Sequence, residues 1–260
     1  MDEEKALRVE DFKQIVLEQG FNEEILTKDY YLMRTLFLLK DVKSVYFKGG
    51  TALQKILLHH ARLSEDIDYT LTRDIKLVIA EIRPILEKSG LFEKITNDKD
   101  VEGFTRLVAH YYGFTGKPDT LFLDLNERGK LLTPPEKHSI EHFYNRFIPN
   151  FSVKTLSIEE MVAEMVAAAI GRNRPRDHYD IYQIIKHKIP INMKLVEKKC
   201  KESGDEFSII RMFNNAKKLK NRWDTDMIPL IKDEVTFHEV MQTLATYFKL
   251  KKEKERLKTR

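Results

Sequence analysis

The chain has 260 residues, with 45 Lys and Arg against 41 Asp and Glu, so its formal net charge is +4. Hydrophobic residues make up 42% of the sequence and aromatic residues 10%, which favours a packed core and excludes an intrinsically disordered chain. The single cysteine, Cys200, excludes an internal disulfide framework, and no apolar run approaches the ~20 residues of a transmembrane helix. We therefore expect a cytoplasmic protein with no membrane partner.

Helical and strand-like patterns alternate over the first 150 residues. Apolar residues at helical spacing occur in residues 3–39, interrupted at Gly20, and again in 51–61 and 75–89. Short β-branched and aromatic runs predict strands at 45–47, 66–71, 104–114 and 120–126, with a turn at 116–119. This order predicts a mixed β-sheet with flanking helices.

The pattern becomes helical after Pro134-Pro135. Ser157 and Glu160 have the spacing of a capping box ahead of an apolar helical stripe, and further helices are expected at 176–188, 192–200, 208–220 and 236–250. The predicted fold class is α+β, with an α/β domain and its N-terminal helices over 1–150 and a helical domain over 151–260 that closes the cleft. The basic residues 249–260 are interpreted as a solvated terminal helix, with an RNA-contacting tail as the alternative.

Two carboxylates stand two residues apart on the predicted strand 66–71. Side chains two apart on a strand share a face, so Asp66 and Asp68 project together while Ile67 points into the core. Neighbouring carboxylates repel each other unless a cation lies between them, and Mg²⁺ (or Mn²⁺) prefers oxygen ligands of this kind. Asp124, on the strand 120–126, is the candidate third carboxylate, although each part of this pattern alone also fits an ordinary strand.

A Gly-Gly pair precedes these carboxylates, between the strand 45–47 and the helix after it. Gly49 and Gly50 leave backbone N–H groups unhindered at a helix N-terminus, which favours anion binding, and Thr51 adds a hydroxyl. Gly-Gly by itself is typical of a tight turn. Followed by a helix and an Asp-x-Asp, it indicates metal-assisted phosphate chemistry.

This order of parts resembles the nucleotidyltransferase superfamily that includes DNA polymerase β. The finer match is to the AbiEii/AbiGii toxin family of type IV toxin–antitoxin and phage-defence systems, over about residues 25–245. It is carried by the segments Lys28-Asp29-Tyr30, Phe47-Lys48-Gly49-Gly50-Thr51-Ala52-Leu53, Arg62-Leu63-Ser64-Glu65-Asp66-Ile67-Asp68 and Arg176-Asp177-His178-Tyr179-Asp180-Ile181-Tyr182.

The resemblance implies a transferase that moves NMP from an NTP to an acceptor and releases pyrophosphate. Asp66, Asp68 and Asp124 are implied to be catalytic and to bind the metal. The residues implied to bind the nucleotide are Lys48, Gly49, Gly50, Thr51, Arg62, Arg176, Asp177 and Asp180. Lys48 alternatively faces solvent at the strand end, Arg62 alternatively belongs to a turn, and the Arg176–Asp180 block alternatively forms salt bridges between domains.

The resemblance also implies partners. The implied acceptor is RNA, with the tRNA 3′ end as one candidate and AMP transfer to protein left open, and the adjacent gene is expected to encode a cognate antitoxin. The chain departs from the family at Ala163-Glu164-Met165, where members commonly carry Ala-Glu-Lys. A catalytically weakened nucleotide- or RNA-binding module is therefore the alternative, and a glycosyltransferase with an Asp-x-Asp clamp is a third class.

Overall fold

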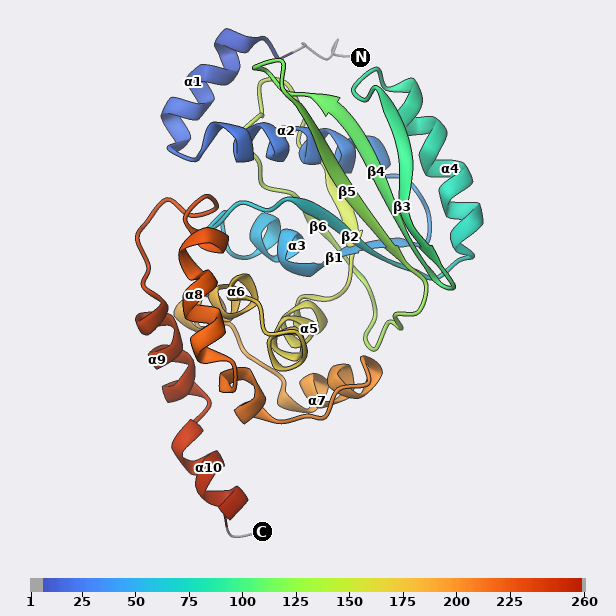
Figure 1. The fold of residues 1–260 in the computed structure, drawn as a ribbon. Helices are drawn as coiled ribbons and strands as arrows, with labels where there is room; N and C mark the ends of the chain where they lie inside the picture. The colour runs from blue at the N-terminus through green and yellow to red at the C-terminus, as the bar shows by residue number, and fades with distance from the viewer. Residues whose placement is uncertain (1–6, 259–260) are drawn as a thin grey trace. The chain divides into compact units, whose positions relative to one another are not determined.

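The computed structural model describes residues 7–258 of the chain. These residues form two compact units that meet in sequence between Ser157 and Ile158. The start of the first expected helix, residues 3–6, and the end of the basic tail, residues 259–260, lie outside the described residues. The first unit contains the β-sheet and the second is helical (Figure 1).

The first unit is built on a seven-stranded mixed sheet in the order β3-β4-β5-β2-β1-β7-β6. The strands are β1 (Val45–Lys48), β2 (Asp66–Leu71), β3 (Lys94–Val101), β4 (Phe104–Tyr112), β5 (Pro118–Asn126), β6 (Glu136–Ser139) and β7 (Ser152–Thr155). β2 pairs with β5 and β1 pairs with β7 in parallel, whereas the remaining pairs are antiparallel. The predicted α+β class with a mixed sheet and flanking helices is confirmed.

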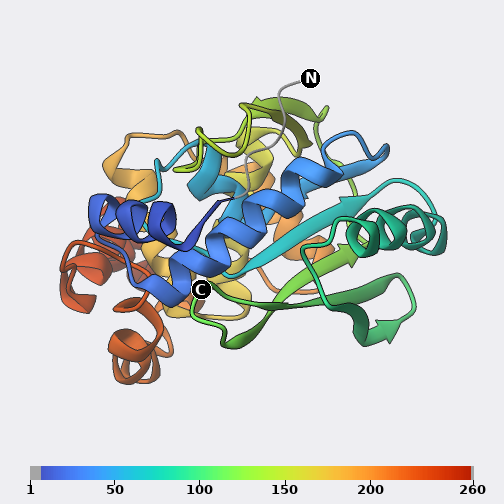
Figure 2. The same ribbon diagram turned by 90° about the horizontal axis from the view of Figure 1, so that it is seen from above.

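Four helices belong to this unit: α1 (Val9–Gln19), α2 (Glu23–Leu39), α3 (Gly49–Ile56) and α4 (Ile75–Lys88). α2 lies across the sheet with α4 alongside it (Figure 2). Tyr31 of α2 stacks on Tyr111 of β4 with ring centroids 3.9 Å apart, so α2 covers the face that Tyr111 shares with the buried Leu107 and Ala109. Strand alternation therefore places Asp68 of β2, Arg106 of β4 and Asp124 of β5 on the opposite face.

Several sequence predictions for this unit were wrong in extent. The helix expected at 51–61 begins at Gly49 and ends at Ile56, and His59 and His60 adopt positive φ angles of 48° and 57°. β3, β6 and β7 were not predicted. β3 and β6 are the two edge strands and carry mostly exposed polar side chains, so neither shows the alternation that identifies a half-buried strand.

The second unit contains α5 (Ile158–Gly171), α6 (Pro175–Lys186), α7 (Met193–Glu202), the 3₁₀ helix η1 (Ile209–Phe213), α8 (Ala216–Met227), α9 (Phe237–Tyr247) and α10 (Leu250–Lys258). The single helix expected at 208–220 is divided into η1 and α8 by Asn214 and Asn215, residues that disfavour helix interiors. The helix expected at 236–250 ends at Tyr247, and Lys249 adopts a φ of 51° before α10. No helix of residues 7–258 is long and apolar enough to span a bilayer.

Candidate active site

Asp66 and Asp68 lie on one face of β2. Both side chains are partly exposed, whereas Ile67 between them is fully buried. The predicted alternation of this strand is confirmed, because the apolar side chain anchors the strand in the core and both carboxylates emerge on the other face.

The neighbouring strands place further charged residues beside Asp68. Its register partner on β1 is Lys48, and its partner on the parallel strand β5 is Asp124. Asp124 is in turn opposite Arg106 of β4. Directly opposed residues share a face, so Lys48, Asp68, Asp124 and Arg106 form a charged row across four adjacent strands.

Asp124 is held by Arg106 through two charge-assisted hydrogen bonds. Arg106 Nε lies 2.6 Å from Asp124 Oδ1, and a terminal nitrogen lies 2.7 Å from Oδ2. The hydrogen bond to Asp124 raises the pKa of Arg106 above its ordinary value. Arg106 was not among the predicted site residues. Its charge could have indicated that it lies on the face opposite the core, because its chain neighbours Thr105 and Leu107 are buried.

Gly49 approaches Asp68 closely at the start of α3. Its φ is +79°, and a Cβ built there would lie 2.6 Å from Asp68 Oδ2. The space beside the carboxylate therefore exists because residue 49 has no side chain. Thr51, in the first turn of the helix, is buried and donates its hydroxyl proton to the carbonyl oxygen of Asp66 at 2.7 Å. This bond fixes the beginning of β2 relative to the helix N-terminus.

Arg62 lies in the loop that leads to β2 and is 4% exposed. Its guanidinium donates to the carbonyl oxygen of Leu63 at 2.9 Å and to Ser64 Oγ at 3.0 Å. These contacts hold the guanidinium within the loop that carries it. Lys48 is partly exposed at the end of β1, and its position in the charged row leaves it a candidate cation for phosphate.

A buried ion pair lies behind the Gly-Gly helix. Lys55 Nζ of α3 bonds Asp29 Oδ1 of α2, and the side chains are 1% and 0% exposed. Tyr144 donates its hydroxyl proton to Asp29 Oδ2 at 3.2 Å and to the Leu26 carbonyl oxygen at 3.0 Å. Burial lowers the pKa of Lys55, and Asp29 opposes that shift. The pair fixes α3 against α2, which gives Asp29 of the Lys28-Asp29-Tyr30 segment a structural role.

The remaining predicted site residues belong to α6 of the second unit. Asp177 is buried and accepts two hydrogen bonds from Arg172, at 3.0 and 2.7 Å. Asp180 is also buried, and Arg176 is partly exposed. Met165 of α5 is buried with the apolar stripe of that helix. A cation of this unit that the sequence analysis missed is Lys199, which lies 2.6 Å from Glu160 and 3.0 Å from Glu164.

The sequence of the chain matches a known protein family. The profile of the family described as "Nucleotidyl transferase AbiEii toxin, Type IV TA system" matches residues 31–246, which is most of the chain. The chain belongs to the AbiEii nucleotidyltransferase toxin family. A comparison with curated protein sequences finds no match.

Solved structures share the fold of the AbiEii chain. MenT4, a nucleotidyltransferase toxin from Mycobacterium tuberculosis H37Rv, is 18% identical with a TM-score of 0.62, over 81% of this chain and 72% of that one. JHP933 from Helicobacter pylori is 18% identical with a TM-score of 0.59, over 92% and 97%. A putative nucleotidyltransferase from H. pylori is 18% identical with a TM-score of 0.60, over 90% and 98%. At this identity the similarity shows the fold.

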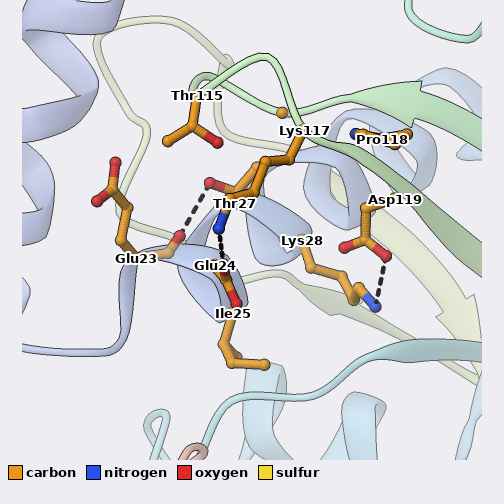
Figure 3. Close-up of a pocket in the computed structure, with 10 residues that line it drawn as sticks. Glu23, Glu24, Ile25, Thr27, Lys28, Thr115, Lys117, Pro118 and Asp119 are labelled. Carbon is orange, nitrogen blue, oxygen red and sulfur yellow. Dashed lines mark hydrogen bonds and ion pairs between the residues drawn. The ribbon is translucent and has the colours of Figure 1, made fainter.

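A hollow of about 420 Å³ in the AbiEii chain lies away from the charged row, between the start of α2 and the turn that joins β4 to β5. Its lysines face acidic partners: Lys117 lies 2.8 Å from Glu24, and Lys28 lies 3.3 Å from Asp119 (Figure 3).

The AbiEii family implies NTP as a substrate and usually a divalent metal ion, which needs oxygen ligands. Within residues 7–258, no three His, Cys, Asp or Glu side chains are gathered as a ready set of ligands. Asp124 instead points its two oxygens at Arg106. Asp66 and Asp68 still fit the ion, because Mg²⁺ is commonly held by one or two carboxylates together with water and substrate phosphates.

Proposed function

We propose that this AbiEii toxin transfers a nucleoside monophosphate from an NTP to an acceptor hydroxyl, with Asp66 and Asp68 holding a divalent metal ion. The observation that carries the proposal is the juxtaposition on one sheet face of the Asp66–Asp68 pair, the neighbouring Asp124 and the start of the Gly-Gly helix. Carboxylates beside a helix N-terminus combine a cation site with an anion site. An NTP that arrives with its metal ion needs both.

The reaction joins the acceptor oxygen to the α-phosphorus and breaks the bond from that phosphorus to the bridging oxygen, so pyrophosphate leaves. The metal ion, when bound, neutralises phosphate charge. Asp124 lies beside Asp68 and is the proposed base that takes the proton of the acceptor hydroxyl. Lys48, at the other end of the charged row, is the proposed partner of the phosphate charge.

Backbone N–H groups of α3 are proposed to hold the outer phosphates. The first turn of a helix has N–H groups without intrahelical partners, and here that turn begins at Gly49, Gly50 and Thr51. The Thr51 hydroxyl already donates its proton to the Asp66 carbonyl oxygen. The backbone N–H of Thr51 is therefore the donor that this residue offers to phosphate, and its hydroxyl holds the metal-binding strand in place. The nucleotide-binding roles of Arg176, Asp177 and Asp180 stay predictions.

The proposed acceptor is RNA, with the tRNA 3′ end as a candidate. Support comes from a basic surface on α8, where Lys217, Lys218 and Lys220 are exposed and Arg222 pairs with Asp226 at 2.7 Å. A hollow of about 390 Å³ on this surface is lined by asparagines, lysines and an arginine and by no acidic residue: Asn214, Asn215, Lys217, Lys218, Asn221 and Arg222. Such a surface suits a phosphate backbone.

The central experiment incubates purified protein with each labelled NTP, Mg²⁺ and total tRNA. We expect label transfer that is lost in Asp66→Asn and in Asp68→Asn. Asp100→Asn is the matched control, because Asp100 is an exposed strand aspartate outside the charged row, and it should retain transfer. Transfer that survives both site substitutions would disprove the proposal. Tight nucleotide or RNA binding with no transfer to any acceptor would favour the alternative, a catalytically weakened binding module.

The RNA surface is tested separately by charge reversal. Lys217→Glu with Lys218→Glu should weaken RNA binding and reduce the slope of log affinity against log salt by about 1–2, since each lost phosphate contact removes about 0.7–0.9. Lys94→Glu, an exposed lysine on β3, is the control. An unchanged slope in the α8 variant would exclude this surface as the contact for the phosphate backbone.

The toxin role has its own readout. Induced expression of the wild-type chain should arrest growth, Asp68→Asn should relieve the arrest, and co-expression of the antitoxin encoded by the adjacent gene should also relieve it. Harmless expression of soluble wild-type protein at high level would contradict this role.

A further inference from the structure

Arg106 binds the carboxylate of Asp124, the third carboxylate of the proposed site. Both oxygens of Asp124 accept hydrogen bonds from its guanidinium, at 2.6 and 2.7 Å. The two side chains are only 23% and 14% exposed, so solvent screens this pair less than a surface salt bridge. A two-point fork of this kind fixes the direction of the carboxylate.

The guanidinium also has neighbours on both strands that flank β4. Asp98 of β3 lies 3.8 Å from Arg106, and the ring of Phe122 lies 4.9 Å from the guanidinium carbon. Asp98 sits at the irregularity where the β3–β4 register shifts, between Asn97 and Lys99. Arg106 is therefore fixed on the sheet face by several contacts, and it extends the charged row toward β3.

The order of charges along this face has a consequence for metal binding. From β4 to β1 the row reads Arg106, Asp124, Asp68 and Lys48, so each carboxylate has one cationic neighbour and one acidic neighbour. A divalent ion that shared Asp124 would lie close to the Arg106 guanidinium and would be repelled by it. After Asp124 and Asp98, the charge of Asp66 also raises the pKa of Arg106. A metal ion held by Asp66 and Asp68 without Asp124 would nevertheless not compete with Arg106 for its carboxylate partner.

We propose that Arg106 is a positioning residue that competes with the divalent metal ion for Asp124. In the nucleotide-free enzyme, Asp66 and Asp68 then hold the metal ion, and Arg106 keeps Asp124 oriented beside them. The inference rests on the proposed function, because it assigns a role toward the metal ion of the same site. A purely structural cross-strand pair would support folding and leave metal affinity unchanged.

The test measures Mn²⁺ binding to nucleotide-free protein by electron paramagnetic resonance of the free ion. Arg106→Gln removes the charge, and we expect it to bind Mn²⁺ about tenfold more tightly than wild type, equivalent to about 1.4 kcal/mol. Arg106→Lys keeps the charge without the fork and should change the affinity less. The gain should disappear in Arg106→Gln with Asp124→Asn, because the competition is for that carboxylate.

Arg83→Gln is the matched control. Arg83 donates to the Ile95 carbonyl oxygen at 2.7 Å and to Asn97 Oδ1 at 2.6 Å, so it is a sheet-associated arginine outside the charged row. It should leave Mn²⁺ affinity unchanged. The transfer rate of Arg106→Gln should fall at the same time as its Mn²⁺ affinity rises, a combination that general loss of structure does not produce.

Unchanged Mn²⁺ affinity in folded Arg106→Gln would overturn the inference, as would a gain that persists in the double variant. Should Arg106→Gln fail to fold, Arg106→Lys decides by the same titration: weaker or equal metal binding overturns the inference and tighter binding supports it. Mn²⁺ binding to Asp66→Ala distinguishes failure of this inference from failure of the proposed function. If wild type binds Mn²⁺ through Asp66 and Arg106 has no effect, only the inference fails. If neither wild type nor Arg106→Gln binds Mn²⁺, both fail.

Discussion

Gly49→Ala tests the close approach between the Gly-Gly turn and the carboxylate strand. The substitution has two separable consequences. A non-glycine residue at a φ of +79° is strained, which costs about 1–2 kcal/mol of stability. The new methyl group would also lie 2.6 Å from Asp68 Oδ2, well inside van der Waals contact, so the Asp68 carboxylate must move away. We expect this movement to disrupt metal binding and to lower the transfer rate.

Gly116→Ala separates the two consequences, because Gly116 has a φ of +76° and nothing lies within 4 Å of its would-be Cβ. Urea unfolding should therefore show a loss of about 1–2 kcal/mol from backbone strain in either variant. The transfer assay should show a fall of at least about tenfold in Gly49→Ala, since a displaced catalytic group commonly costs that much or more. Gly116→Ala should transfer at the wild-type rate.

Full transfer activity in stably folded Gly49→Ala would refute the reasoning. It would mean either that Asp68 tolerates displacement or that the reaction does not use the space beside Gly49. Equal loss of activity in both glycine variants would attribute the effect to backbone strain alone.

Three further predictions follow from buried groups near the site. Lys55→Met should destabilise the protein by about 3–5 kcal/mol in urea unfolding, because it removes the cation that pairs with the buried Asp29 carboxylate. Adding Asp29→Asn should recover part of that loss, and additive losses of stability in the double variant would contradict the pairing. Burial lowers the pKa of His142 to about 4, so the unfolded chain takes up its proton first as the pH falls below 6.5. Stability should then fall between about pH 6.5 and 4 by up to about 3 kcal/mol more than in His142→Phe, and parallel pH profiles of the two proteins would disprove this. Thr51→Val should lose about 1–3 kcal/mol because the Asp66 carbonyl oxygen loses its buried donor, and its transfer rate should fall more than that of the equally destabilised Gly116→Ala.

Local patterns in the sequence were enough to predict the centre of the fold. Asp66–Leu71 is a strand with the predicted bounds, because Ile67 and its apolar neighbours alternate with polar residues. Gly49-Gly50 marks the passage from β1 to α3 because a positive φ and a close approach to Asp68 both require the absence of a side chain. The edge strands β3 and β6 escaped prediction because a strand with exposed polar side chains has no apolar period to detect.

The sequence by itself determined the residue types that point to phosphate chemistry and the family to which the chain belongs. Only the tertiary structure decided which charges meet. Arg106 and Asp124 are 18 positions apart and become partners through the register of β4 with β5, while Lys55 and Asp29 become a buried pair through the packing of α3 on α2. Such pairings depend on strand register and helix packing, which bring distant segments together and leave no periodic signal in either segment alone.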